Sequence, residues 1–359
     1  MIATHAQSGA AKLPGYDADL AQCSVSGLSS GAFMAVQLHL AHSSMFAGAG
    51  VIAGGPYRCA ESFRGASAIA EDAYVQGALY VCMNPLIPQA GPDPERLAAV
   101  ARQTAADRLI DPLRNLADDK VYLFTGSEDK VVNSSVVRAT RHFYELLGVP
   151  PSNLKFVGDV PAGHAILTTN PEDNPLAANR PPYINRLDGS RMQSRDILEH
   201  IYGPLKPPAD KPGGRLLRFD QREFFGGERR ASMSEYAYAY VPRSVEDGAR
   251  CRIHVALHGC KQGYNYVNVV DGRPDHANEP PFGDRYVTST GYNEVADTND
   301  IVVLYPQVEG VDDEAAQNPD GCWDWWGYSS PDADHPDFYS RQAIQIRAIH
   351  GMLQRLGSR

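Results

Sequence analysis

A serine flanked by glycines stands at the junction of two regular patterns near the start of the chain. The segment CSVSGLSSGAFMAVQ places Ser29 in Gly-Leu-Ser-Ser-Gly, after an apolar run typical of a strand and before a periodic run typical of a helix. A strand-to-helix turn of this kind strains its serine and needs glycines where strand and helix cross. The pattern indicates that Ser29 is a nucleophile for acyl transfer. The alternative is that Ser29 only caps the helix.

Two later loops offer the partners that such a serine needs, because a hydroxyl becomes nucleophilic only beside a histidine base that a carboxylate orients. The segment KVYLFTGSEDKVV places Asp129 after a predicted strand and a Gly-Ser turn, and NLKFVGDVPAGHAI places His164 in a glycine-flanked loop after the next strand. The order Ser, Asp, His is that of α/β-hydrolases. We therefore predict His164 as the base and Asp129 as its acid, the alternative being that Asp129 or Glu128 caps a helix.

Acyl transfer also needs backbone N–H donors for the developing oxyanion. The residue after the nucleophile, Ser30, supplies one of them. In CRIHVALHGCKQGY an apolar strand ends in His258-Gly259-Cys260, which is similar to the His-Gly oxyanion turns of esterases. We predict the amide of Cys260 as the second donor. The alternative is an ordinary strand end.

All three tryptophans lie in GCWDWWGY at 321–328. Core packing would explain one of them, but adjacent Trp325 and Trp326 cannot both face inward on an extended segment. We predict that Trp325, Trp326 and Tyr328 line a substrate surface, together with His258 of the oxyanion turn.

The elements that must position these residues alternate between short apolar runs and helical patterns, which is typical of a mostly parallel sheet covered by helices on both faces. Strands are predicted at 22–28, 48–53, 120–125, 154–158, 215–219, 234–241, 252–257 and 301–305. Helices are predicted at 31–43, 95–106, 134–147, 194–202 and 338–356.

Two proline-rich stretches interrupt this alternation. The stretch 168–188 is predicted to be an irregular excursion, and 204–214 (PLKPPADKPGG) a surface connection. Neither half of the chain carries a complete reaction centre. We therefore predict one catalytic domain over 1–359, without a separate polymer-binding domain.

Composition and charge exclude several partners. The formal net charge is −10 and the pI is near 5.5, which argues against nucleic acid. No apolar run reaches the roughly 18 residues of a membrane span. The six cysteines are widely spaced, so we expect no metal site. Acyl transfer by a serine triad needs no cofactor, and we expect none. They indicate buried thiols or an oxidising compartment, and we expect a secreted or periplasmic protein in its mature form, since no signal peptide is visible.

Taken together, GLSSG, TGSED, AGHA, LHGC and GCWDW resemble the single-domain, circularly permuted α/β-hydrolases that are poly(3-hydroxybutyrate) depolymerases of fungi and bacteria. The resemblance covers most of the chain, including AGGPYRCA, EHIYG and YNEVADTNDIVVLYPQ. It implies the triad and oxyanion donors given above, and Trp325 at a substrate crevice. It also implies the disulfides Cys59–Cys82 and Cys260–Cys322.

The permuted form has support in the chain order. The predicted oxyanion strand 252–257 follows the nucleophile, whereas ordinary members place it before, so an ordinary chain would begin near Arg215.

Cys23 and Cys251 lack partners in the family pattern. Each opens a predicted strand, and in this fold the two strands are neighbours, so we hypothesise that they pair with each other.

These observations lead us to expect a serine esterase acting on short-chain hydroxyalkanoate polyesters or oligomers, with adsorption to solid polymer through apolar residues at the crevice mouth. One alternative is a feruloyl or acetylxylan esterase, because carbohydrate esterases share similar HGC and GxSxG turns. Another is a non-catalytic adhesive protein that kept the fold. The number of subunits stays open.

Overall fold

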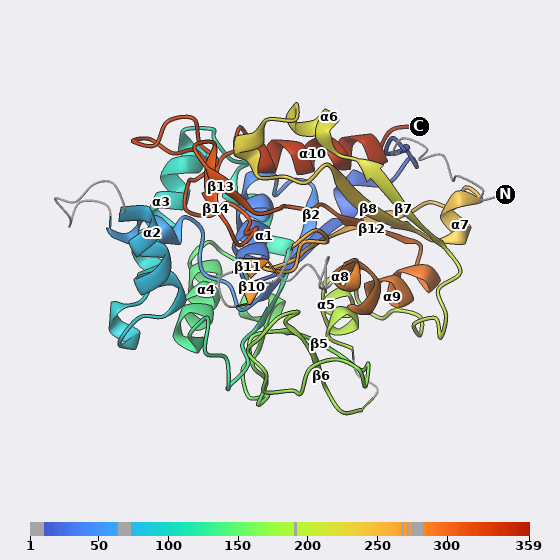
Figure 1. Ribbon diagram of the computed structural model, residues 1–359, viewed down its shortest axis with the longest axis horizontal. Helices are drawn as coiled ribbons and strands as arrows, with labels where there is room; N and C mark the ends of the chain where they lie inside the picture. Colours follow the sequence, from blue (N-terminus) through green and yellow to red (C-terminus); the bar gives the residue numbers. More distant parts are fainter. Residues whose placement is uncertain (1–10, 64–72, 190–191, 267–268, 271–272, 275–282) are drawn as a thin grey trace.

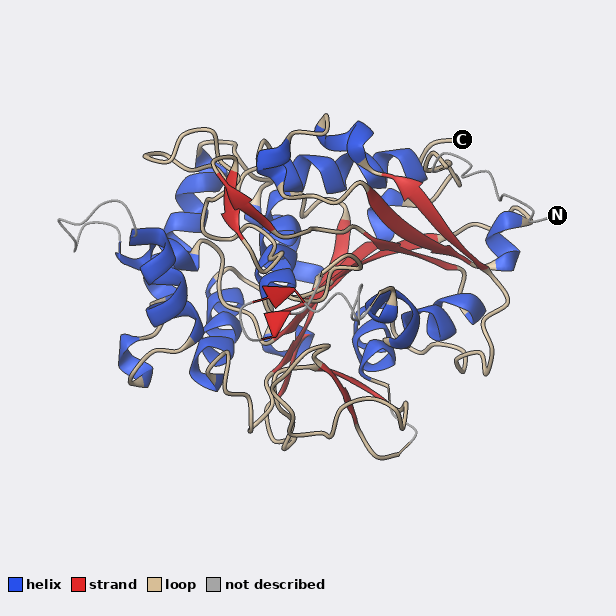
Figure 2. Cartoon of the chain, viewed as in Figure 1, coloured by secondary structure: helices blue, strands red, loops and turns tan. Residues whose placement is uncertain are grey.

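The centre of the fold is an eight-stranded sheet (Figure 2). The computed structural model describes residues 11–63, 73–189, 192–266, 269–270, 273–274 and 283–359. In the order of the sheet the strands are β4 (Leu154–Val157), β3 (Lys120–Phe124), β2 (Phe46–Ile52), β1 (Cys23–Leu28), β9 (Arg252–Leu257), β12 (Ile301–Tyr305), β8 (Tyr236–Val241) and β7 (Arg215–Asp220). The neighbouring strands from β4 to β12 in this order pair in parallel, and β8 is antiparallel to both β12 and β7.

The two halves of the chain meet at the middle of this sheet. Strands β1 to β4 come from the first half, and β7, β8, β9 and β12 come from the second. Strand β1 pairs with β9 in a register that sets Ser24 beside His254. The stretch 204–214 runs between α5 (Gln193–Tyr202) and β7 without regular structure. Both halves therefore share one hydrophobic core.

Helices cover both faces of the sheet (Figure 1). On one side lie α1 (Ser30–Ala41), which packs on β1 and β2, and α10 (Ile344–Leu356). On the other, α5 packs on β2 and β3, and α9 (Tyr292–Thr298) packs on β12. All twelve residues of α1 are buried, as expected for a helix that is mostly apolar around its circumference.

The remaining elements are short or peripheral. The other α-helices of the described residues are α2 (Ala73–Gly77), α3 (Pro94–Ala106), α4 (Ser134–Leu146), α6 (Arg222–Phe225), α7 (Arg243–Glu246) and α8 (Arg285–Ser289). Three two-stranded sheets pair β5 (Ile166–Thr168) with β6 (Ile184–Arg186), β10 (Val269–Val270) with β11 (Arg273–Pro274), and β13 (Val311–Asp313) with β14 (Ala316–Asn318). Within the described residues, no helix combines the length and apolar character needed to cross a membrane.

The structure confirms all eight predicted strands and corrects two expectations. The last helix begins at Ile344 and not near 338, because Asp337 accepts hydrogen bonds from the amide and hydroxyl of Ser340 and ties 337–343 into turns. The stretch 168–188 is not wholly irregular, since its ends lie in the parallel pair β5 and β6.

Three histidines are buried in the neutral form. His254 lies between two serine hydroxyls, with Nδ1 2.7 Å from Ser24 Oγ and Nε2 2.8 Å from Ser26 Oγ. Burial lowers the pKa of His254 to about 3. Burial also lowers the pKa values of His42 and His258, each to about 4.

These histidines predict a loss of stability in acid. The unfolded chain protonates them below about pH 6.5, whereas the folded chain keeps them neutral, so their contribution is complete above that pH and is lost as pH falls. We expect the free energy of unfolding in guanidinium chloride to fall between about pH 6.5 and pH 5, by up to about 1.4 kcal/mol per pH unit for each histidine. His254→Gln should reduce the slope, and His335→Gln, at an exposed site, should not. A pH-independent free energy would contradict this expectation.

Candidate active site

Ser29 occupies a strained turn at the carboxyl end of β1. Its φ is 56° and its ψ is −122°, a conformation that residues with a side chain rarely adopt. The flanking glycines are required by close approach: a Cβ on Gly27 would lie 2.2 Å from the carbonyl oxygen of Gly31, and one on Gly31 would lie 2.4 Å from the carbonyl oxygens of Leu257 and His258. The turn has the geometry of a nucleophile elbow.

Asp129 and His164 meet beside this turn from the loops after β3 and β4. The Nδ1 atom of His164 lies 2.9 Å from Oδ2 of Asp129, and both side chains are almost completely buried. The other carboxylate oxygen accepts the backbone N–H groups of Val131 and Val132 at 2.8 and 3.0 Å. His164 and Ser29 line the same cavity. The carboxylate is thus held so that the imidazole donates from Nδ1 and leaves Nε2 free to accept a proton.

The backbone amides of Ser30 and Cys260 have no hydrogen-bond partner among the described residues. Next to Cys260, the N–H of Gly259 donates to Oε1 of Gln262 at 2.6 Å and is already occupied. The carbonyl of Gly259 lies 2.7 Å from Nδ1 of His258. Because the carbonyl and the following N–H of a trans peptide point in opposite directions, this bond turns the Cys260 amide away from His258.

His258 does not line the cavity, contrary to the sequence-based expectation. Its side chain is fully buried. The N–H of Val308 donates to Nε2 at 3.2 Å, so Nδ1 carries the proton that is donated to the Gly259 carbonyl. Burial lowers the pKa of His258 to about 4. His258 therefore supports the oxyanion turn from beneath as a neutral ring and is not available to a substrate.

The cavity above Ser29 has a volume of about 540 Å³ and an aromatic wall. Trp325 and Trp326 both line it, and Trp325 stacks on Phe33 with ring centroids 3.8 Å apart. Trp326 packs edge-on against Trp325 and is the more exposed of the two. Polar residues of the β14 region and Lys261 also line the cavity. The cavity can therefore accept a chain that alternates apolar and ester groups.

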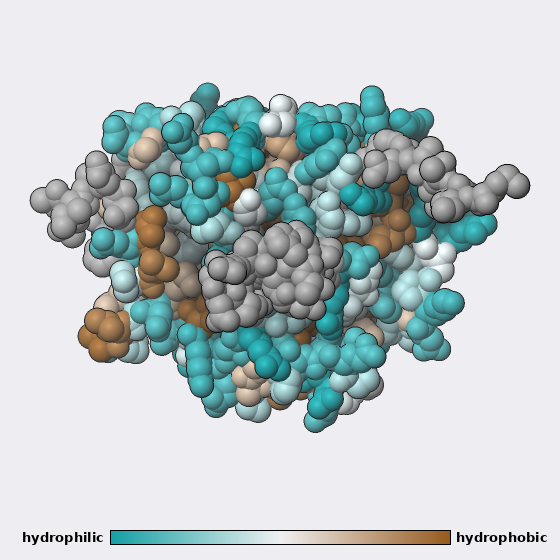
Figure 3. Space-filling model, in the orientation of Figure 1, coloured by the Kyte–Doolittle hydropathy of each residue, from teal (hydrophilic) through white to brown (hydrophobic). Residues whose placement is uncertain are grey.

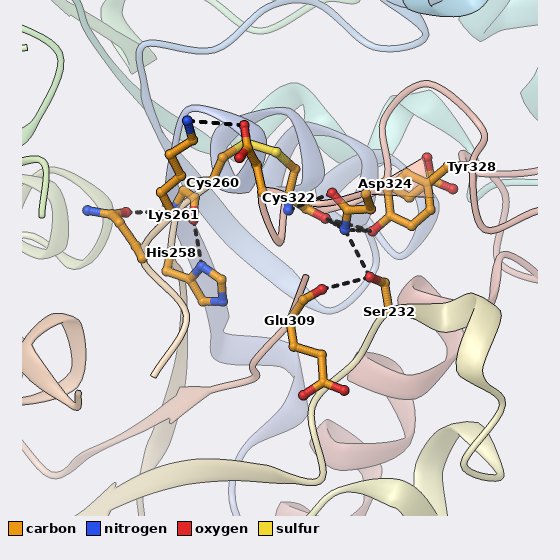
Figure 4. Close-up of a disulfide and its surroundings, with 12 residues drawn as sticks. Ser232, His258, Cys260, Lys261, Glu309, Cys322, Asp324 and Tyr328 are labelled. Carbon is orange, nitrogen blue, oxygen red and sulfur yellow. Dashed lines mark hydrogen bonds and ion pairs between the residues drawn. A yellow bond between two sulfur atoms is a disulfide. The ribbon is translucent and has the colours of Figure 1, made fainter. Parts of the chain in front are cut away.

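Tyr328 is the second predicted lining residue that the structure places elsewhere (Figure 4). Its hydroxyl donates to the carbonyl of Cys322 at 2.6 Å and accepts from the side-chain amides of Asn318 and Gln345 at 3.0 and 2.9 Å. The ring thus supports the loop that carries the tryptophans and does not face the cavity.

Asp324 is a supporting residue that the sequence analysis did not identify. Its buried carboxylate accepts the N–H groups of Trp326, Gly327 and Ser329 at 3.2, 2.6 and 2.9 Å, and the hydroxyl of Ser329 at 2.6 Å. Burial raises the pKa of Asp324. The sequence offers one signal for this role, which is an acidic residue between tryptophans. A charged residue in such an apolar segment is buried mainly where it is paired or fully hydrogen-bonded.

Both disulfides expected from the family resemblance are present. Cys59–Cys82 joins two segments of the first half, and Cys260–Cys322 joins the oxyanion turn to the tryptophan loop (Figure 4). Cys23 and Cys251 are buried free thiols, so the hypothesis that they pair is wrong.

The Cys260–Cys322 bridge should affect both stability and turnover. It closes a loop with a sequence separation of 62, which corresponds to about 4 kcal/mol in the chain-entropy model. Cys322→Ser leaves the Cys260 amide in the chain but loosens it, so we expect a lower melting temperature and a kcat loss of about tenfold, part of the cost of losing an oxyanion donor. Cys251→Ser, at a free thiol, is the matched control. An unchanged kcat in Cys322→Ser would contradict the expectation.

The sheet, the strained serine after β1 and the buried Asp129–His164 pair define the chain as an α/β-hydrolase. No protein-family model matches the sequence. The poly(3-hydroxybutyrate) depolymerase of Delftia acidovorans is 38% identical over 354 residues, which cover 97% of this chain and 62% of the relative. The polyhydroxybutyrate depolymerase of Talaromyces funiculosus is 32% identical over 370 residues, which cover 98% of this chain and 94% of the relative. The chain belongs to the polyhydroxybutyrate depolymerase family.

Solved structures agree with this assignment. A PHB depolymerase from Penicillium funiculosum and a serine-to-alanine PHB depolymerase complexed with an R3HB trimer each superpose with a TM-score of 0.76 at 30% identity. In both cases the match covers 97% of this chain and 100% of the other.

Proposed function

We propose that the protein is a serine esterase that hydrolyses poly(3-hydroxybutyrate) and related short-chain hydroxyalkanoate polyesters and oligomers. The observation that carries the proposal is the convergence on one cavity of Ser29, in its strained turn, and His164, bound to Asp129. The unpaired amides of Ser30 and Cys260 belong to residues that line the same cavity.

In the proposed mechanism, Ser29 attacks the ester carbonyl while His164 Nε2 takes the hydroxyl proton. Asp129 stabilises the imidazolium that forms. The amides of Ser30 and Cys260 bind the oxyanion of the tetrahedral intermediate. His164 then gives its proton to the departing alcohol, and the resulting acyl-enzyme is cleaved by a water molecule that His164 activates in the same way.

The names of the relatives support the polyester as substrate. The two curated relatives are poly(3-hydroxybutyrate) and polyhydroxybutyrate depolymerases, and one solved neighbour holds an R3HB trimer. The cavity suits such a chain because its aromatic and aliphatic walls can contact methyl groups, and an uncharged ester needs no paired charge.

Adsorption to solid polymer has a candidate surface next to the cavity. Val75 and Leu79 line the cavity and are also exposed, and Tyr80, Leu86 and Ile87 continue the exposed apolar run. Figure 3 shows hydrophobic residues gathered on this side of the molecule, over α2 and the segment that follows it. Exposed apolar residues grouped on one side of a molecule are typical of an interaction site.

This surface predicts a difference between solid and soluble substrates. Leu86 is 95% exposed, so Leu86→Ser removes a contact with a polymer film but no packing. We expect slower clearing of poly(3-hydroxybutyrate) film and unchanged kcat/KM on a soluble p-nitrophenyl ester. Leu109→Ser, at an exposed leucine outside the surface, should leave both rates unchanged. Equal film rates for Leu86→Ser and the wild type would contradict the expectation.

The chain order supports a circularly permuted hydrolase made of one catalytic domain over 1–359. In ordinary members the strand before the oxyanion turn precedes the nucleophile strand, whereas here β9 follows β1. Strand β7, at one edge of the sheet, would be the first strand of an ordinary chain, which would begin near Arg215.

We also propose a secreted or periplasmic location, which the two disulfides support.

The test is a clearing assay on poly(3-hydroxybutyrate) beside a feruloyl ester and a p-nitrophenyl ester, each with Ser29→Ala as control. We expect the wild type to clear the polymer and to release 3-hydroxybutyrate or its oligomers, and Ser29→Ala to do neither. Activity on the feruloyl ester alone would overturn the substrate, and activity that survives in Ser29→Ala would overturn the mechanism.

A further inference from the structure

The acid and the base of the site stand on loops that follow different strands, β3 and β4. Near the strand ends the two loops share backbone hydrogen bonds. The N–H of Ser127 donates to Val160 O at 2.8 Å, and the N–H of Glu128 donates to Ala162 O at 3.0 Å. Beyond Ala162 these contacts stop. Some other group must therefore fix His164 relative to the acid loop.

Asn179 joins the two loops at this point. Its Oδ1 accepts the N–H of His164 and the N–H of Lys130, each at 2.9 Å. Its Nδ2 donates to the carbonyl of Glu128 at 2.9 Å and to that of Ala177 at 3.1 Å. One side-chain amide thus binds the backbone on both sides of the acid and the backbone of the base.

Apart from the Asp129–His164 pair, Asn179 is the one side chain within the described ranges whose hydrogen bonds connect these loops. We propose that Asn179 is a positioning residue that holds the imidazole of His164 in line with Asp129. This inference rests on the proposed function of the site. It assigns a role in the reaction to the stretch 168–188, which carries none of the reacting groups.

The segment around Asn179 is itself held firmly. Asn185 is fully buried, and its Nδ2 donates to the carbonyls of Leu176 and Ala178, each at 2.8 Å. The histidine loop packs directly on this segment, because a Cβ on Gly163 would lie 2.1 Å from the carbonyl oxygen of Ala178. The amide of Asn179 is therefore presented to the two loops from a fixed support.

The chemistry requires an amide at this position. Two donors face Oδ1 and two acceptors face Nδ2, so only a group that accepts on one atom and donates on the other satisfies all four. An aspartate would keep the bonds from Lys130 and His164, lose those to Glu128 and Ala177, and place a negative charge near the imidazole. An alanine would lose all four.

The experiment measures kcat and KM on a p-nitrophenyl ester for wild type, Asn179→Ala, Asn179→Asp and Asn174→Ala. Asn174 is the matched control, because its side-chain amide donates only within the same segment, to the carbonyls of Arg180 and Pro181. We expect Asn179→Ala to lose about 10- to 100-fold in kcat with KM within about twofold of wild type. Asn174→Ala should stay within about twofold in both.

Two further readouts separate positioning from general stability. The downfield proton resonance of His164 Nδ1–H, bonded to a carboxylate, should be present in wild type and Asn174→Ala and broadened or lost in Asn179→Ala. Asn179→Asp should move the acid limb of the kcat/KM profile to higher pH, because a nearby carboxylate favours the protonated imidazole.

A kcat within about twofold of wild type together with an intact downfield resonance in Asn179→Ala would overturn the proposal. Should Asn179→Ala not fold, Asn179→Asp decides, and a wild-type kcat and pH profile in that variant would overturn it. Failure of the proposed function is recognised separately, because the wild type would then show no Ser29-dependent hydrolysis. In that case the proton resonance of His164 still tests whether Asn179 positions the imidazole.

Discussion

Ser29→Ala is expected to reduce kcat on a p-nitrophenyl ester by about 10⁶-fold, the typical cost of removing the nucleophile of a serine hydrolase. The residual rate would come from the oxyanion donors and substrate binding alone. Folding should be unaffected, because the hydroxyl makes no packing contact that alanine loses and the strained backbone remains. Steady-state kinetics with a melting curve for each variant would measure both effects.

Ser30→Ala is the control for this substitution. The Ser30 hydroxyl is buried and has no hydrogen-bond partner among the described residues, while the proposed role of Ser30 belongs to its backbone amide. We expect Ser30→Ala to keep kcat within about threefold of wild type, since the oxyanion donor is retained. A severe loss in Ser30→Ala beside a mild one in Ser29→Ala would mean that the motif has been assigned to the wrong serine.

Asp129→Asn is expected to lower kcat by about 10⁴-fold, the typical effect of this change in a Ser-His-Asp triad. The structure gives the reason. Because Val131 and Val132 both donate to Oδ1, the amide oxygen of an asparagine must face them, and its NH₂ group must face His164. Nδ1 of His164 would then accept, the ring proton would move to Nε2, and the ring could no longer take the proton of Ser29.

Glu128→Gln provides the matched control, since Glu128 is the neighbouring acidic residue and its side chain is exposed. It should retain the wild-type kcat. Kinetics on the soluble ester and thermal melting would show whether Asp129→Asn loses rate without losing its fold. A wild-type rate in Asp129→Asn, or a loss confined to Glu128→Gln, would remove Asp129 from the mechanism.

The sequence predicted the sheet and the loops that carry Ser29, Asp129 and His164 because both leave local patterns. Each strand is a short apolar run bounded by turn residues, and carboxyl ends of parallel strands meet at one edge of a sheet. The glycines at 27 and 31 were predicted from the same turn that the structure shows. The aromatic wall followed from the adjacent Trp325 and Trp326.

The placements that the sequence does not predict depend on contacts between distant segments. His258 is buried because Val308, separated by 50 residues, donates to its ring. Tyr328 turns inward because buried acceptors and donors meet its hydroxyl. Cys23 and Cys251 do not pair, since the register of β1 with β9 sets Ser24 level with His254 and so leaves Cys251 out of line. Side-chain direction and strand register are set by tertiary packing, which no local pattern encodes.

The pairing of β1 with β9 also has a consequence for how the chain reaches its native state. The hydrogen-bonded residues Ser24 and His254 are separated by 230 positions. Strand β1, which leads into Ser29, therefore keeps one edge unpaired until the residues of β9 have been synthesised. Contacts of such long range slow folding, and open apolar edges favour aggregation. Strand β1 is the first strand of the sheet to be synthesised, but its pairing with β9 forms late.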